Sequence, residues 1–215
     1  MKKILSIDFD IIMSPCIQLY NNYSTDDWEA LCSHFEILKF AKPDYIHFKR
    51  LLQLLLKLSK SMKKENIHFI ASHEMIATYI DKNINDTISL INIDHHHDIA
   101  YADKDIENKI EDLNCGNWVK YLSEEGKLEN YVWIRNEDST NYPEDRKFNF
   151  SSTPIIECNL ETIDAPDELF ICLSPQWVPP HLRCLFYIIV DIFNSIYDTE
   201  FKVQGDEEEN NGKYI

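Results

Sequence analysis

The run Asp94-His95-His96-His97-Asp98 combines metal-ligating side chains directly after an apolar segment that is expected to form a strand. Alternate side chains of an extended backbone point to the same side, so Asp94, His96 and Asp98 are expected to face one point in space. Open α/β sheets place their sites at this end of their strands. Carboxylates with an imidazole suit Mn²⁺, Fe²⁺ or Zn²⁺ better than an ion that prefers thiolates. The run therefore predicts a metal site, with a solvated histidine-rich turn as the alternative.

A second pair of carboxylates, Asp8 and Asp10, lies at the end of the apolar run at residues 3–9. Two carboxylates on the same side of a strand repel each other unless a cation lies between them, although a D-x-D sequence also occurs in surface turns. His73 lies where an apolar run leads into a helical pattern, and it is either a third ligand or a cap or core residue. Together these clusters meet the charge demand of two divalent ions about 3.5 Å apart.

Two further segments could line a pocket beside these residues. Residues 114–118 (NCGNW) form a glycine-containing turn before a helical pattern, and residues 174–180 (SPQWVPP) form a loop that its prolines make rigid. Ordinary turn formation is the alternative for both.

The elements that must position these side chains follow from the hydrophobic pattern. Short runs rich in β-branched and aromatic residues predict strands at residues 3–9, 67–71, 88–93, 131–134, 154–158 and 169–173. Helical periodicity predicts helices at residues 45–63, 74–80, 110–122 and 181–197. This alternation predicts a three-layer α/β fold with a mostly parallel sheet and helices on both faces. Residues 1–203 are expected to form a single domain, residues 138–149 a loop, and the acidic residues 204–215 a flexible tail.

Composition excludes several classes of protein. The chain has 37 acidic residues against 21 Lys and Arg, a net charge of −16, which argues against a nucleic-acid partner. Its 4 glycines are widely spaced and form no phosphate-binding loop. The apolar run after Lys3 is cut at Asp8 and Asp10, too early for a signal peptide, so we expect a cytoplasmic protein. The apolar segment at residues 51–58 is far shorter than the roughly 20 residues of a membrane span, so we expect no membrane partner. The 6 cysteines form no CxxC pair and are expected to be buried free thiols. Nothing in the sequence indicates an oligomeric state.

These motifs resemble those of the arginase and deacetylase superfamily. Residues 6–15 (SIDFDIIMSP) are similar to the ureohydrolase signature S-x-D-x-D-x-x-D-P, with Ser14 in place of its third Asp, and residues 94–98 (DHHHD) are similar to D-A-H-x-D. Ser72-His73 resembles the G-G-D-H element, and residues 114–117 resemble the S-G-N segment. The chain is short and its D-x-D element comes first. Both features resemble a permuted, small ureohydrolase-like family that includes the peptide arginases of ribosomal peptide (RiPP) biosynthesis.

The resemblance implies a binuclear manganese centre and a substrate. One Mn²⁺ would be held by His73, Asp94, Asp98 and Asp8, and the other by Asp94, His96, Asp8 and Asp10. The implied reaction converts arginine residues of a precursor peptide to ornithine and urea, and the remaining acidic residues could steer this basic substrate. Asp98 would orient the attacking hydroxide and help to carry its proton to the leaving amine.

Two functional elements of the family have no counterpart in this sequence. The V-E-x-N-P element with the guanidinium-binding Glu is absent, so the candidates to bind substrate are Asn117, Gln176 and Glu74. The proton-shuttling His is also absent from its expected position. His95, His97 or His181 could take that role, and we choose His97 as the second catalytic residue.

Other functions remain open. Asp94-His95-His96 reads as the DHH motif of a class of metal-dependent phosphoesterases, although the N-terminal His-rich strand end and Gly-rich domain of that class are missing. A haloacid-dehalogenase-type phosphatase also begins with D-x-D, but it prefers Thr or Val where this chain has Ile12. A deacetylase-like or other guanidino or amide hydrolase on the same fold is a further alternative, as is a metal-binding protein without enzymatic activity.

Overall fold

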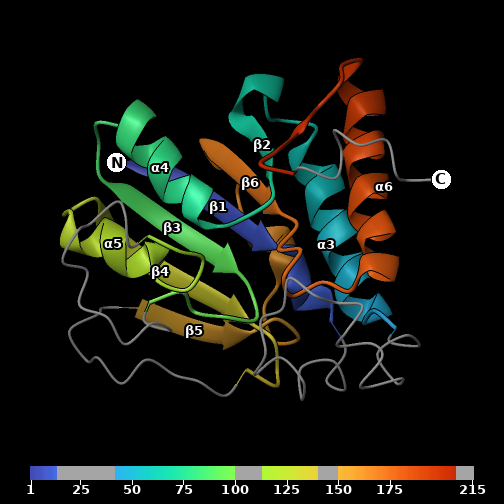
Figure 1. Cartoon of the computed structure of the whole chain (residues 1–215), viewed down its shortest axis with the longest axis horizontal. Helices are drawn as coiled ribbons and strands as arrows, with labels where there is room; N and C mark the ends of the chain where they lie inside the picture. The colour runs from blue at the N-terminus through green and yellow to red at the C-terminus, as the bar shows by residue number, and fades with distance from the viewer. Residues whose placement is uncertain (14–41, 100–112, 140–149, 207–215) are drawn as a thin grey trace.

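The strands of this computed structural model form one parallel sheet (Figure 1). The structure describes residues 1–13, 42–99, 113–139 and 150–206. In these ranges the strands are β1 (Lys2–Asp8), β2 (Ile67–Ile70), β3 (Ile88–Ile93), β4 (Leu128–Arg135), β5 (Phe150–Pro154), β6 (Glu168–Cys172) and β7 (Val203–Gln204). Their order is β5-β4-β3-β1-β6-β2-β7, and every neighbouring pair runs parallel.

Four α-helices connect these strands within the described residues. They are α3 (Tyr45–Leu58), α4 (Glu74–Asn83), α5 (Trp118–Glu124) and α6 (Pro180–Tyr197), with the short 3-10 turns η1 (Phe9–Ile12), η3 (Lys64–Asn66) and η4 (Leu160–Thr162). Asp44 caps α3, because its Oδ1 accepts hydrogen bonds from the backbone N–H groups of Ile46 and His47 at 2.8 and 3.0 Å. None of the described helices combines the length and the apolar character needed to cross a bilayer.

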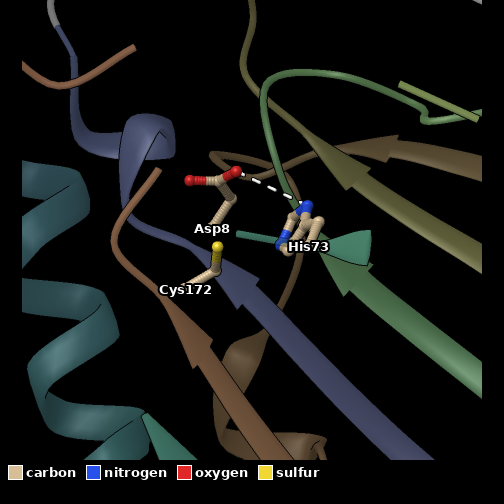
Figure 2. A group of neighbouring side chains, drawn as sticks. All are labelled: Asp8, His73 and Cys172. Atoms are coloured by element: carbon tan, nitrogen blue, oxygen red, sulfur yellow. Dashed lines mark ion pairs between the residues drawn. The ribbon is translucent and has the colours of Figure 1, made fainter. Parts of the chain in front are cut away.

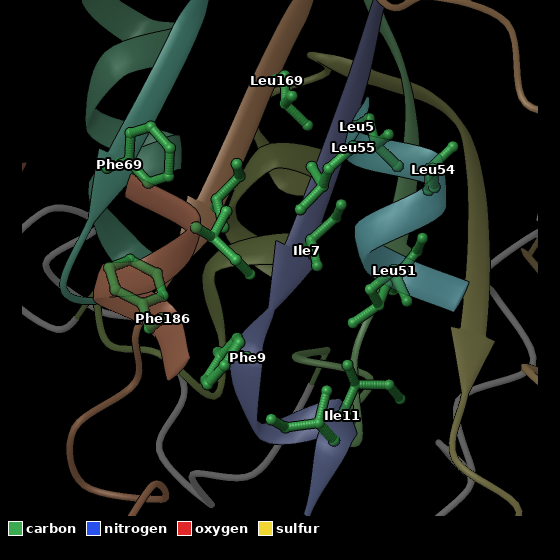
Figure 3. Packing of buried hydrophobic residues seen from close by; sticks show 14 of the residues in the cluster. Leu5, Ile7, Phe9, Ile11, Leu51, Leu54, Leu55, Phe69, Leu169 and Phe186 are labelled. Carbon is green, nitrogen blue, oxygen red and sulfur yellow. The ribbon is translucent and has the colours of Figure 1, made fainter. Parts of the chain in front are cut away.

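Helices cover both faces of the sheet, as Figure 1 shows. On one face, Leu5 and Ile7 of β1 belong to a cluster with buried residues of α3 and α6, such as Leu55 and Phe186 (Figure 3). On the other face, Ile4 belongs to a second cluster with residues of α4 and α5. This alternation along β1 is what a strand buried on both sides requires. The predicted three-layer α/β fold with a parallel sheet is confirmed.

The direction of the chain connections changes between the neighbouring strands β1 and β3. The chain leaves β1 towards β2 on one side of the sheet, and it leaves β3 through α5 towards β4 on the other side. Neighbouring strands whose connections diverge in this way leave a crevice beyond their carboxyl ends, where open α/β sheets bind ligands. Asp8 is the last residue of β1, Asp10 follows it in η1, and residues 94–98 follow β3.

The strand predicted at residues 154–158 is wrong. β5 ends at Pro154, and the backbone N–H groups of Glu157 and Cys158 both donate to the Pro154 carbonyl, at 3.0 and 3.1 Å. Ile155 is buried in the first core cluster although it lies in this turn, whereas Ile156 is 51% exposed. The apolar pair Ile155 and Ile156 therefore lies in a turn after Pro154, and only one of the two side chains is buried.

Other predicted elements also differ in extent, and the helix predicted at residues 45–63 ends at Leu58. Residues 110–112 of the predicted helix 110–122 lie outside the described residues, and the helix begins only at Trp118, because Asn117 has a non-helical φ of −135° and ψ of 2°. Val203–Gln204 forms the unpredicted strand β7, in which Gln204 pairs with Ile70. The tail predicted from residue 204 otherwise falls mainly on residues 207–215, and most of the predicted loop on residues 140–149, both outside the described residues.

Two neighbouring leucines of α3 test this packing. Leu55 is 1% exposed, so Leu55→Ala should remove apolar contacts, leave a cavity and lower the free energy of unfolding by about 2–5 kcal/mol. Leu56 is 37% exposed, so Leu56→Ala should change it by less than about 1 kcal/mol. Urea unfolding of both variants measures the difference. Equal losses would contradict the orientation of α3.

Candidate metal centre

Acidic and imidazole side chains converge at the carboxyl ends of the central strands. Asp8 ends β1, Asp10 lies in η1, Asp94 and Asp98 follow β3, and His73 immediately precedes α4. Each of these five residues is at most 3% exposed. Charged groups are almost never buried to this degree unless they are paired or bind a metal.

One imidazole nitrogen faces three carboxylates. His73 Nδ1 lies 2.9 Å from Asp98 Oδ2 and 3.3 Å from Asp94 Oδ2. It also lies 3.5 Å from Asp8 Oδ2. The other ring nitrogen, Nε2, is 3.2 Å from the hydroxyl of Ser6, which orients the ring. Oxygens from two separate segments, the end of β1 and the run after β3, therefore meet one nitrogen, as they would around a cation.

A second group lies on the other side of Asp94. His96 Nδ1 is 3.0 Å from Asp10 Oδ2 and 3.9 Å from Asp94 Oδ1. Asp10 is fully buried, yet no hydrogen bond of acceptable geometry reaches its Oδ2. Asp94 contributes its Oδ2 to the first group and its Oδ1 to the second. Because the unsatisfied oxygen of Asp10 is costly in the interior, a cation bound beside it would stabilise the fold.

These side chains could hold a metal ion. In three groups, the ligand atoms all lie within 4.8 Å of one another: His73 with Asp94 and Asp98, Asp10 with Asp94 and His96, and Asp8 with His73 and Cys172. The six ligands predicted from the sequence thus fall into groups that share members. Carboxylates with imidazoles are a donor set that suits a divalent transition metal.

The electrostatics of the cluster favour added positive charge. Burial, and then the charges of Asp10 and Asp94, raise the pKa of Asp8 well above its ordinary value. Burial and Asp98 likewise raise the pKa of Asp94. Burial opposes a charge on His96, but the adjacent Asp10 carboxylate outweighs it and raises the pKa of His96 to about 9. Without a metal, protons must therefore balance these carboxylates.

Neighbouring donors hold the carboxylates in place. The indole Nε1–H of Trp118 donates to Asp98 Oδ2 at 2.6 Å, and the Ser174 hydroxyl donates to Asp8 Oδ2 at 2.6 Å. Both donors are themselves buried. Such supporting bonds orient ligands and commonly matter for metal affinity almost as much as the ligands do.

The backbone of residues 94–98 is not extended, so its side chains do not alternate as the sequence pattern predicted. Residues 94–96 bend, and Asp98 has a left-handed φ of 54°, which Asp tolerates better than most residues. The Asp98 carbonyl then accepts a hydrogen bond from the Val119 N–H at 3.1 Å, which fixes the turn against α5. The three side chains therefore do not face one point from one side of a strand. Asp98 belongs to the group of His73, His96 belongs to the group of Asp10, and Asp94 belongs to both.

His95 and His97 lie outside the ligand groups of the described residues. His97 Nδ1 accepts a hydrogen bond from the Ile99 N–H at 3.1 Å, and its ring packs edge-on against Trp133. The carbonyl of His95 accepts a bond from the Ser139 hydroxyl at 2.7 Å. Burial, the largest cause in both cases, lowers the pKa of each histidine to about 4. Both rings are therefore neutral near neutral pH.

The three predicted substrate-binding residues lie next to residues of the cluster or next to residues that contact it. Glu74 follows His73 and accepts a hydrogen bond from Ser72 Oγ. Asn117 precedes Trp118 and is buried, and its Oδ1 accepts from the Asn114 N–H at 2.8 Å. Gln176 is exposed in a turn. Their binding of a substrate stays a prediction.

Cys172 is the ligand-type residue that sequence reasoning missed. It is the last residue of β6 and is fully buried beside Asp8 and His73. A thiol at the end of an apolar run is typical of a core residue, so only its position at the same edge of the sheet as Asp8 could have identified it. Trp118 and Ser174, which support the ligands, were recognised only as parts of turns.

Comparisons with known proteins do not assign this chain to a family. Models of protein families, curated proteins and solved structures all gave no match to it. Its function must therefore be inferred from the converging ligands, the unsatisfied Asp10 oxygen and the supporting donors.

The indole of Trp118 provides a test of the supporting bonds. Trp118→Phe removes the donor to Asp98 but keeps an aromatic ring in the core, and we expect it to weaken divalent metal binding by about 10- to 100-fold. Trp133→Phe is the matched control, since Trp133 is equally buried but donates to the main-chain carbonyl of Asp94. Titration calorimetry with Mn²⁺ or Zn²⁺ measures both. An affinity loss no larger in Trp118→Phe than in Trp133→Phe would contradict the role of Trp118.

The neutral His97 predicts a dependence of stability on pH. Its pKa is about 4 in the folded protein and about 6.5 when unfolded, so the unfolded chain binds the proton first as the pH falls. The folded state thus loses stability between about pH 6.5 and 4, by at most about 3 kcal/mol. His97→Asn retains an acceptor for the Ile99 N–H but does not titrate. Urea unfolding of the metal-free proteins should show the variant gaining relative to wild type as the pH falls, and parallel curves would contradict this.

Proposed function

We propose that this protein is a binuclear metal hydrolase that converts arginine residues of a peptide to ornithine with release of urea. The observation that carries the proposal is the pair of ligand groups that share Asp94 through its two oxygens. The resemblance of the sequence to the permuted ureohydrolase-like family implies carboxylate and imidazole ligands at these same positions. The cluster lies at the carboxyl ends of β1 and β3, where the chain connections diverge, and this position supports a catalytic rather than a purely structural role.

The proposed cofactor is a pair of Mn²⁺ ions, with Fe²⁺ or Zn²⁺ as alternatives. His73, Asp98 and Asp8 would hold one ion with Asp94, and Asp10 and His96 would hold the other with Asp94 and Asp8. When bound, such a pair lowers the pKa of a water molecule and stabilises developing negative charge. The buried carboxylates supply the charge that two divalent cations need.

Asp98 is the stronger of the two proposed catalytic residues. Its Oδ2 accepts the Trp118 indole N–H and faces His73 Nδ1, so its carboxylate is held in one orientation beside the first ligand group. This is the requirement for a group that orients a nucleophile and passes its proton to the leaving amine. His97 is less suited, because its Nδ1 already accepts the Ile99 N–H and its ring packs against Trp133.

The accessible edge of the cluster lies at His96. Its side chain is 17% exposed, and its ring packs at 4.7 Å against the half-buried ring of Trp177. Gln176 is exposed next to this pair. A guanidinium reaching the cluster would therefore pass an aromatic side chain and a polar side chain, and the net charge of −16 favours the approach of a cationic substrate.

The activity can be tested with metal-loaded protein and peptides that contain a single arginine. We expect the peptide mass to fall by the difference between arginine and ornithine, with one urea released per conversion. Asp94→Asn removes a ligand from both groups and should abolish the conversion and most metal binding. Asp191→Asn changes an exposed aspartate of α6 and should leave both unchanged.

The outcomes separate the alternatives. If Mn²⁺-, Fe²⁺- and Zn²⁺-loaded protein released no urea from arginine peptides or free arginine, the proposed activity would be wrong. Cleavage of a phosphodiester such as bis-(p-nitrophenyl) phosphate, lost in Asp94→Asn, would instead favour the phosphoesterase alternative. Equal activity of wild type and Asp94→Asn would reject a metal-dependent mechanism.

A further inference from the structure

A buried thiol lies next to the first ligand group (Figure 2). β1 and β6 are parallel neighbours, and Asp8 and Cys172 are partners in their register, so both side chains lie on the same face of the sheet. Figure 2 shows the side chains of Asp8, His73 and Cys172 as neighbours, with the Cys172 sulfur pointing towards Asp8. Their ligand atoms all lie within 4.8 Å of one another, and none of the three residues is more than 3% exposed. Three donor types therefore meet at one buried point.

The thiol has only weak partners in the protein. Its Sγ is 3.4 Å from the Ala71 carbonyl and 3.3 Å from Ser174 Oγ. A thiol is a poor hydrogen-bond donor, so little is lost if its proton leaves. Burial raises the pKa of Cys172 well above its ordinary value, and a thiolate would form here only together with a bound cation.

We propose that Cys172 Sγ is a ligand of the ion held by Asp8 and His73. This inference rests on the proposed metal centre and makes its two positions chemically different. Binding replaces the S–H bond by a sulfur–metal bond and releases the proton to solvent, without oxidation or reduction. The group of Asp10, Asp94 and His96 offers only oxygen and nitrogen.

The different donors imply different metal preferences. A thiolate favours Zn²⁺ or Fe²⁺ over Mn²⁺, whereas carboxylates with one imidazole suit Mn²⁺. Ser174 connects the two donors of the first position, because its hydroxyl donates to Asp8 Oδ2 at 2.6 Å and also contacts Cys172 Sγ. At the position of Asp8 and His73, Cys172 therefore shifts the preference from Mn²⁺ towards Zn²⁺ or Fe²⁺, the alternatives named for the proposed cofactor.

Cobalt provides a spectroscopic test that does not depend on activity. Co²⁺ bound to the full-length wild-type protein should show visible d–d bands and a near-ultraviolet thiolate-to-cobalt charge-transfer band. Cys172→Ser should keep the visible bands and lose the charge-transfer band. Cys115→Ser is the matched control, since burial and the charges of Asp98 and Glu74 also act on that thiol, and it should retain the band.

A competition experiment provides the second measurement. The preference of the wild-type protein for Zn²⁺ over Mn²⁺ should fall at least about tenfold in Cys172→Ser, measured by the metal content after equilibration with both ions. A cobalt-bound wild type without the charge-transfer band, or a band that disappears in Cys115→Ser but not in Cys172→Ser, would overturn the proposal. If Cys172→Ser does not fold, Cys172→Ala provides the same comparison, and a wild type without the band overturns the proposal in either case.

The test is independent of the proposed activity. A charge-transfer band without urea release would support the thiolate ligand and reject the peptide arginase. Urea release without the band in the cobalt-bound wild type would support the activity and reject the ligand.

Discussion

Negative charge buried at the carboxyl edge of the sheet is the constraint on which the site depends. Asp8, Asp10 and Asp94 are at most 3% exposed, and burial raises the pKa of Asp8 and Asp94. An ionised carboxylate without a partner in the interior costs several kcal/mol, and the two imidazoles, His73 and His96, can each supply at most one positive charge. The fold can hold these carboxylates only if protons or metal ions balance them. A divalent ion does this without keeping the carboxylates protonated at neutral pH.

The parallel sheet explains how such a cluster can form at all. Parallel strands end at the same edge, so segments distant in sequence are brought together there, as Asp8 and Asp98 are. The two apolar core clusters stabilise this arrangement, because helices on both faces bury the strands and hold their ends in position. Since the apolar clusters stabilise the sheet, its edge can carry groups that are unfavourable without a cation.

Hydrophobic patterning predicted much of the fold because both faces of the sheet are buried, and the central strands therefore appear as continuous apolar runs. The same reasoning failed at Ile155, where an apolar residue fills the core from a turn, and at Val203–Gln204, which is too short to carry a pattern. Ligand types at strand ends predicted the acidic and imidazole cluster. The left-handed turn at Asp98 and the thiol of Cys172 could not be predicted, because a positive φ and a register partner have no local signature.

Two polar residues inside the apolar strands connect the fold to the site. Ser6 of β1 and Asn92 of β3 are fully buried and are register partners, so they lie on the same face of the sheet. Ser6 Oγ lies 3.2 Å from His73 Nε2, and Asn92 Nδ2 donates to Asp94 Oδ2 at 2.9 Å. An apolar residue at either position would avoid burying a polar group but would leave a ligand without its support. These two interruptions of the apolar pattern therefore support His73 and Asp94, and they connect the buried strands to the ligands beyond their carboxyl ends.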